Sequence, residues 1–122
     1  MTKKVKKDSS DILTEVIVKG MEEKKAENIV VLNLKKIKNA ICDYFVICEG
    51  SSNTHVDAIA DSIIEEVRKT LNEKPYHKEG FENAEWILLD YVNVVAHVFQ
   101  PEKRAFYNLE DLWADAETIN YN

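Results

Sequence analysis

Apolar residues recur along the chain with two different periods, and these periods predict an order of helices and strands. Between Ser9 and Ala26 apolar residues repeat every three or four positions, which is the spacing of one face of an α-helix. The same spacing returns between Val56 and Leu71 with charged residues opposite, which predicts a strongly amphipathic helix. The other apolar runs are short and rich in β-branched residues, so strands are predicted at 29–34, 44–48, 86–90 and 94–99.

Capping and turn residues predict where these elements begin and end. Ser9 or Ser10 can cap the first helix, Gly20 within it can mark a close backbone approach, and Pro101 can open a short helix after the last strand. Polar residues at 1–8 and 115–122 are expected to fray, and 76–84 is expected to be a loop. The order predicts one α/β (α+β) domain over 1–122, with helices packed on a single mixed sheet of four to five strands.

Composition and charge narrow the classes of function. The chain has 122 residues, 45% hydrophobic and 31% charged, as in soluble globular domains. Its 16 Lys and Arg against 22 Asp and Glu give a net charge of −6, which disfavours a dedicated nucleic-acid binder and suits a basic partner. Cys42 and Cys48 are too few for a disulfide scaffold or a zinc site. With no membrane-length apolar run and no signal peptide, a cytoplasmic protein without cofactor or metal is predicted.

One strand-to-helix junction resembles an anion site. Gly50-Ser51 precedes a predicted helix, where backbone amides can hold a phosphate. Nucleotidyl transfer also needs paired carboxylates that hold two metal ions, but Asp57 and Asp61 lie on the polar side of the helix. No nucleophile–base motif accompanies the three histidines. A non-catalytic protein is therefore favoured, and a nucleotide-binding or nucleotidyltransferase-type domain using Gly50-Ser51 is the alternative.

The hairpin formed by the last two strands has one unusual face. With Val92-Asn93 as its two-residue turn, alternate side chains point to opposite sides of the hairpin. One side is compact and apolar, and the other carries Trp86, Leu88, Asp90, Val95, His97 and Phe99. Large apolar groups mixed with an acid and an imidazole are typical of a protein-binding surface. The last helix, carrying Phe106 and Trp113, could instead cover this face, and the pattern alone favours neither interpretation.

Several segments in collinear order resemble one known family. They are residues 43–47, 50–52 with 58–61, 79–80 with Trp86-Ile87-Leu88-Leu89-Asp90-Tyr91, Val94-Val95-Ala96-His97-Val98-Phe99, and 106–113. Over roughly residues 8–116 the chain resembles the ribosomal silencing factor family, also called RsfS or Iojap. It departs from the family pattern at the hairpin turn, where Val92-Asn93 stands in place of Gly-Asp.

The resemblance implies a fold, a partner and a function. It implies a nucleotidyltransferase-like fold without the catalytic carboxylates, and hence a protein that is not an enzyme. The implied partner is ribosomal protein fourteen, a basic protein on the intersubunit face of the large ribosomal subunit. The partner-binding residues are then expected to be those of the mixed hairpin face, with Trp86 as the largest anchor and the His97 imidazole exposed to the partner. Binding there would block joining of the small and large subunits and repress translation, especially under nutrient limitation. A strand edge or the apolar patch could also hold a homodimer of the free protein.

Overall fold

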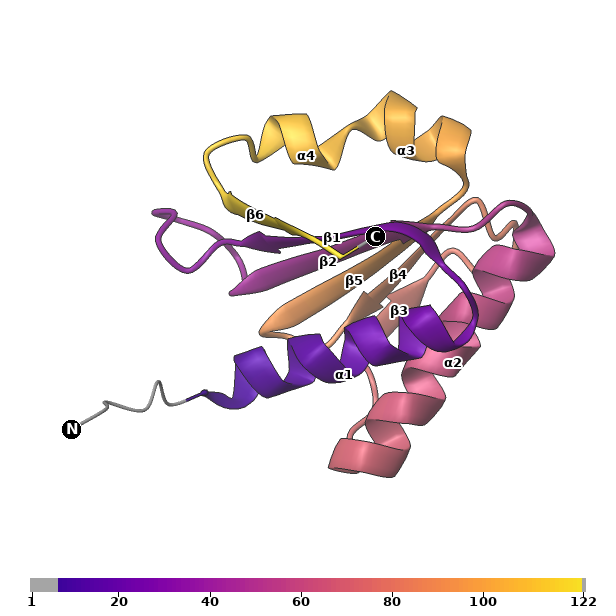
Figure 1. Ribbon diagram of the computed structural model, residues 1–122, viewed down its shortest axis with the longest axis horizontal. Helices are drawn as coiled ribbons and strands as arrows, with labels where there is room; N and C mark the ends of the chain where they lie inside the picture. The colour runs from indigo at the N-terminus through magenta and orange to yellow at the C-terminus, as the bar shows by residue number, and fades with distance from the viewer. Residues whose placement is uncertain (1–6, 122) are drawn as a thin grey trace.

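The computed structural model describes residues 7–121 and has one six-stranded sheet between two layers of helices (Figure 1). Along the chain the elements are α1 (Ser9–Glu23), β1 (Glu27–Asn33), β2 (Tyr44–Glu49), α2 (Asn53–Leu71), β3 (His77–Glu79), β4 (Trp86–Asp90), β5 (Val94–Phe99), α3 (Pro101–Tyr107), α4 (Leu109–Leu112) and β6 (Glu117–Asn120). The strand order is β3-β4-β5-β2-β1-β6, with β2 and β5 parallel and the other neighbours antiparallel. Helices α1 and α2 lie on one face of the sheet, and α3 and α4 lie on the other (Figure 1).

The α+β class, the mixed sheet and the predicted helices and central strands are confirmed, but the sheet has six strands rather than four to five. The tail predicted to fray contains β6, whose backbone pairs with β1 from Asn33 to Val30. The Tyr121 N–H extends this pairing by donating to the Ile29 carbonyl at 2.9 Å. At the other end, residues 1–6 lie outside the described residues, whereas Asp8 is the N-cap of α1.

The start of α1 is fixed by a capping box in which Asp8 replaces the predicted Ser9 or Ser10. The Asp8 carboxylate accepts from the Asp11 N–H at 2.9 Å, and the Asp11 carboxylate accepts from the Asp8 N–H at 3.1 Å. Each aspartate side chain therefore satisfies the backbone N–H of the other aspartate.

Gly20 marks a close approach of α1 to α2, as its place within a helix predicted. A Cβ added at Gly20 would lie 2.8 Å from the Ile63 Cα, too close for a side chain. The Ser62 hydroxyl donates to the Gly20 carbonyl at 2.7 Å. The two helices therefore cross in direct backbone contact, which lets both lie on the sheet.

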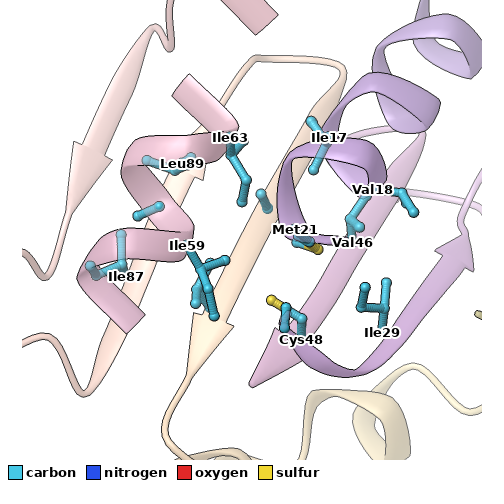
Figure 2. Close-up of a cluster of buried hydrophobic side chains, with 14 of the residues drawn as sticks. Ile17, Val18, Met21, Ile29, Val46, Cys48, Ile59, Ile63, Ile87 and Leu89 are labelled. Atoms are coloured by element: carbon cyan, nitrogen blue, oxygen red, sulfur yellow. The ribbon is translucent and has the colours of Figure 1, made fainter. Parts of the chain in front are cut away.

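The larger core lies between α1, α2 and the sheet. Figure 2 shows the buried side chains that α1 and α2 bring to those of the central strands, among them Ile17, Met21, Ile59, Ile63, Val46, Cys48, Ile87 and Leu89. All eight are fully buried. Burial also raises the pKa of the Cys48 thiol, which is consistent with an inert core cysteine.

A smaller core lies on the opposite face, beneath α4. Phe45 and Ile47 of β2 and Phe99 of β5 are buried there, with Leu109 and Trp113 packed against them from above. This cluster centres on β1, β2 and β5. Strand β4, which lies next to the edge strand β3, is therefore covered less completely on this face than on the other.

Candidate functional site

The β4–β5 hairpin has the predicted register. Trp86 pairs with Phe99 and Leu88 pairs with His97, and the Tyr91 N–H donates to the Val94 carbonyl at 2.9 Å to close the turn. The apolar side of the hairpin packs under α1 and α2, as expected. The six predicted site residues consequently share the opposite face, beside α3.

These six residues differ in exposure. Val95, His97 and Phe99 on β5 are buried, with 6%, 4% and 0% of their surface exposed. Trp86 and Leu88 on β4, in contrast, are half-buried, as is Asp90. Only the β4 residues can therefore touch a partner without a rearrangement.

The last helical segment covers part of this face. The Trp113 ring packs edge-on against Phe45, with 5.8 Å between ring centroids. Phe106, however, is 78% exposed, and its ring lies edge-on to Tyr107 with 5.1 Å between ring centroids. On the hairpin itself, the β5 residues are covered, whereas Trp86 and Leu88 on β4 are covered only in part.

The Trp86 indole is held on three sides. Its ring stacks on Phe99 with 4.9 Å between centroids, and Tyr107 of α3 contacts it at 4.6 Å. Its Nε1–H donates to Nδ1 of His97 at 3.1 Å. A large aromatic group whose position is fixed before binding can serve as an anchor at low entropic cost.

His97 supports this anchor from below. Because Nδ1 accepts the indole hydrogen bond, a neutral imidazole carries its proton on Nε2, which is buried and has no partner among the described residues. Burial lowers the pKa of His97 to about 3, so the ring is neutral near pH 7. The expectation of an imidazole exposed to a partner is wrong, because the side chain lies beneath Trp86 and beside Phe45.

Two shallow depressions flank Trp86. One of about 160 Å³ is lined by Glu79, Gly80, Trp86 and Leu88. The other, of about 290 Å³, is lined by Gly80, Glu82, Asn83, Glu85, Trp86, Lys103 and Tyr107. We call Trp86 and Leu88, with the edge residues Glu79, Glu82, Glu85, Asp90 and Tyr107, the Trp86 surface.

Backbone geometry brings the segment that carries Glu79 and Glu82 close to the Trp86 indole. Gly80 has a φ of +91°, and a Cβ there would lie 2.0 Å from the Trp86 carbonyl oxygen. Only glycine allows this approach of the loop to β4. Sequence reasoning missed Glu79 and Tyr107 as parts of the surface, and the Glu79-Gly80 pair at a predicted loop was the only indication of the approach.

The alternative site at Gly50-Ser51 is filled by the protein's own groups. The Ser51 N–H donates to Nδ1 of His55 at 2.9 Å, and the His55 N–H donates to the Ser52 hydroxyl at 3.1 Å. The His55 ring is anchored through Nε2, which donates to the Lys24 carbonyl at 2.8 Å. The geometry therefore offers little support for an anion site at this junction.

Residues 7–121 contain neither a metal centre nor a membrane-spanning helix. No group of three or more His, Cys, Asp or Glu side chains is placed to hold a metal ion in this range. No helix there has the length and apolar character needed to cross a membrane.

Comparisons with known proteins agree with the fold. A family model described as "Ribosomal silencing factor during starvation" matches residues 6–122. A ribosomal silencing factor RsfS of Halalkalibacterium halodurans is 43% identical over 114 residues, covering 91% of this chain and 93% of the relative. One from Bacillus subtilis is 38% identical, covering 85% and 86%. A crystal structure of a Chromobacterium violaceum protein superposes with a TM-score of 0.80 at 28% identity, covering 84% of each chain. The chain belongs to the ribosomal silencing factor family.

Proposed function

We propose that the chain binds ribosomal protein fourteen on the intersubunit face of the large subunit, blocks joining of the two subunits and represses translation, especially under nutrient limitation. The observation that carries this proposal is the Trp86 surface, where a half-buried indole and Leu88 lie among four carboxylates, with the Lys103 ammonium group beside one of them. Aromatic anchors edged by charge are typical of protein interfaces, and acidic edges complement a basic partner. The net charge of −6 likewise favours association with a basic partner.

This function requires no catalytic step. A folded body of 14.1 kDa bound to the joining face would keep the small subunit away by occupying its place. Affinity and position alone then determine repression, and neither a cofactor nor a membrane takes part. We accordingly expect the chain to act on cytoplasmic ribosomes.

Co-sedimentation with isolated large ribosomal subunits tests the proposal. The parent chain should sediment with the subunits. Purified ribosomal protein fourteen, added in excess, should displace the chain from them. Trp86→Ala should weaken binding by about thirtyfold or more, the usual effect of removing a central aromatic anchor. It should also release the block on subunit joining.

Tyr121→Ala is the matched control, because Tyr121 is a 39% exposed aromatic residue beside the opposite edge of the sheet. It should bind like the parent. Melting curves recorded alongside ensure that Trp86→Ala is folded when its binding is measured. A parent chain that stays in the supernatant, or a folded Trp86→Ala that binds like the parent, would contradict the proposal.

A further inference from the structure

Arg104 on α3 is a buried cation that joins three other parts of the molecule. It is 9% exposed, and its Nε and Nη2 atoms donate to the two carboxylate oxygens of Glu110 at 3.1 and 2.9 Å. Its Nη1 donates to the Glu49 carboxylate at 3.1 Å and to the Asn28 carbonyl at 2.6 Å. The planar guanidinium fork matches this geometry, whereas a lysine ammonium cannot make all four contacts.

The Asn28 carbonyl reaches Arg104 because β1 is irregular there. The pairing of β1 with β2 shifts register between Glu27 and Val30, and Asn28 has a φ of 52°. A residue with left-handed backbone conformation at a bulge redirects the strand. Asparagine adopts this conformation more readily than most residues. The irregularity of β1 thus provides an acceptor for α3.

Arg104 lies on the same short helix as the aromatic residue that contacts Trp86. Tyr107, whose ring contacts the indole, follows Arg104 by three residues on the same short helix. At the start of α3, the Gln100 N–H donates to the Glu85 carbonyl at 2.8 Å. The Gln100 side-chain amide also donates to the Ala84 carbonyl at 3.2 Å, and Lys103 reaches Glu85 only at 4.0 Å. The four contacts of Arg104 are therefore the main polar attachment at the Tyr107 end of α3.

We propose that Arg104 is a positioning residue of the Trp86 surface, which holds α3 so that Tyr107 rests against Trp86 before a partner arrives. This inference builds on the proposed function, because it assigns a role within the same binding surface. A side chain that is already ordered loses less entropy on binding, so a preorganised surface binds more tightly.

A double-mutant cycle on binding to isolated large ribosomal subunits tests the inference. Arg104→Lys keeps the charge but loses the fork, and it should weaken binding by about three- to tenfold, the effect of releasing one side chain. If Arg104 acts through Tyr107, the double variant Arg104→Lys/Tyr107→Ala should bind no more weakly than Tyr107→Ala alone. Arg68→Lys is the matched control, because Arg68 lies exposed on α2 and pairs with Glu65.

The indole N–H resonance of Trp86 supplies a readout that does not depend on binding. Its signal, assigned by its loss in Trp86→Phe, should shift in Arg104→Lys and stay unchanged in Arg68→Lys. If Arg104→Lys folds poorly, Glu110→Gln replaces it as the test variant. Glu110→Gln removes the negative charge of the ion pair and should shift the signal in the same sense.

An unshifted resonance, parent-like affinity of folded Arg104→Lys, or losses that add in the double variant would overturn the inference. If the parent chain fails to bind large subunits, the proposed function fails. The resonance then decides by itself whether Arg104 sets the surroundings of Trp86.

Discussion

At the scale of single residues, the Trp86–His97 pair combines a half-exposed indole with a buried imidazole. The hydrogen bond needs a free lone pair on Nδ1, so protonation of that atom would break it. The buried ring is surrounded by the aromatic rings of Trp86, Phe45 and Phe99, none of which carries a negative charge. Burial without a counter-charge accordingly lowers the pKa of His97 to about 3.

This low pKa predicts that the chain loses stability as the pH falls. The unfolded chain holds this histidine at a pKa near 6.5, so below that pH it binds a proton that the folded chain does not. The free energy of unfolding should therefore be fully retained above about pH 6.5 and should decrease towards pH 3. At pH 5 the His97 contribution to the loss should be about 2 kcal/mol.

His97→Asn tests this prediction, because asparagine can place an acceptor near the Nδ1 position but does not titrate. Urea unfolding at pH 7 and pH 5 should show a smaller difference in unfolding free energy for His97→Asn than for the parent. The exposed His77 provides the control His77→Asn, which should keep most of the parent's pH dependence. Equal pH dependence in His97→Asn and the parent would show that the buried imidazole is not responsible.

At the scale of elements, the turn of the β4–β5 hairpin is strained at one position. Val92 has a φ of 76°, a conformation that a β-branched residue rarely adopts, and its side chain is 58% exposed. Its N–H donates to the Asp90 carboxylate at 2.7 Å, so Asp90 shapes the turn as well as edging the Trp86 surface.

Val92→Gly should stabilise the hairpin by about 1 kcal/mol, since the relief of strain exceeds the entropy that glycine adds to the unfolded chain. The urea midpoint should rise while the slope of the transition stays the same. Asn93→Gly is the control, because Asn93 is not among the residues with positive φ and should gain nothing. A midpoint for Val92→Gly at or below that of the parent would show that Val92 is not strained.

Elements with an apolar pattern of their own could be predicted from the sequence, and the edge strands could not. The residues of β3 and β6 are all exposed, so no alternation marks them, and these strands depend on backbone bonds to β4 and β1. The polar segments that contain them look like loops or fraying ends until the neighbouring strand is known. The same reason explains why Glu79 was missed as part of the Trp86 surface.

At the scale of the whole molecule, the candidate site exists because the two faces of the sheet are covered unequally. Helices α1 and α2 have 15 and 19 residues, whereas α3 and α4 have only 7 and 4. The hairpin register, which the sequence predicted, places all six candidate residues on the less covered face. Which of them are exposed depends on how far α3 and α4 reach, and no periodicity along β4 or β5 contains that information.

The distribution of charge and apolar surface predicts how binding to large subunits should depend on salt. The carboxylates Glu79, Glu82, Glu85 and Asp90 edge the surface, while Trp86 and Leu88 form its centre. Exposed edge charges mainly raise the association rate and are screened by salt, whereas apolar burial is not. At constant magnesium, affinity should fall by less than about tenfold between about 50 and 200 mM salt, compared with about a thousandfold or more for six to ten phosphate contacts.

Association and dissociation rates measured on immobilised large subunits separate the two contributions. Salt should lower the association rate and leave the dissociation rate nearly constant. The double variant Glu82→Gln/Glu85→Gln should make the association rate less dependent on salt. Glu15→Gln/Glu22→Gln on α1 removes the same charge from the opposite face and should change the rates less, because a charge farther from the contact is more strongly screened. A steep loss of affinity with salt would instead indicate that ribosomal RNA, rather than a basic protein, provides most of the contact.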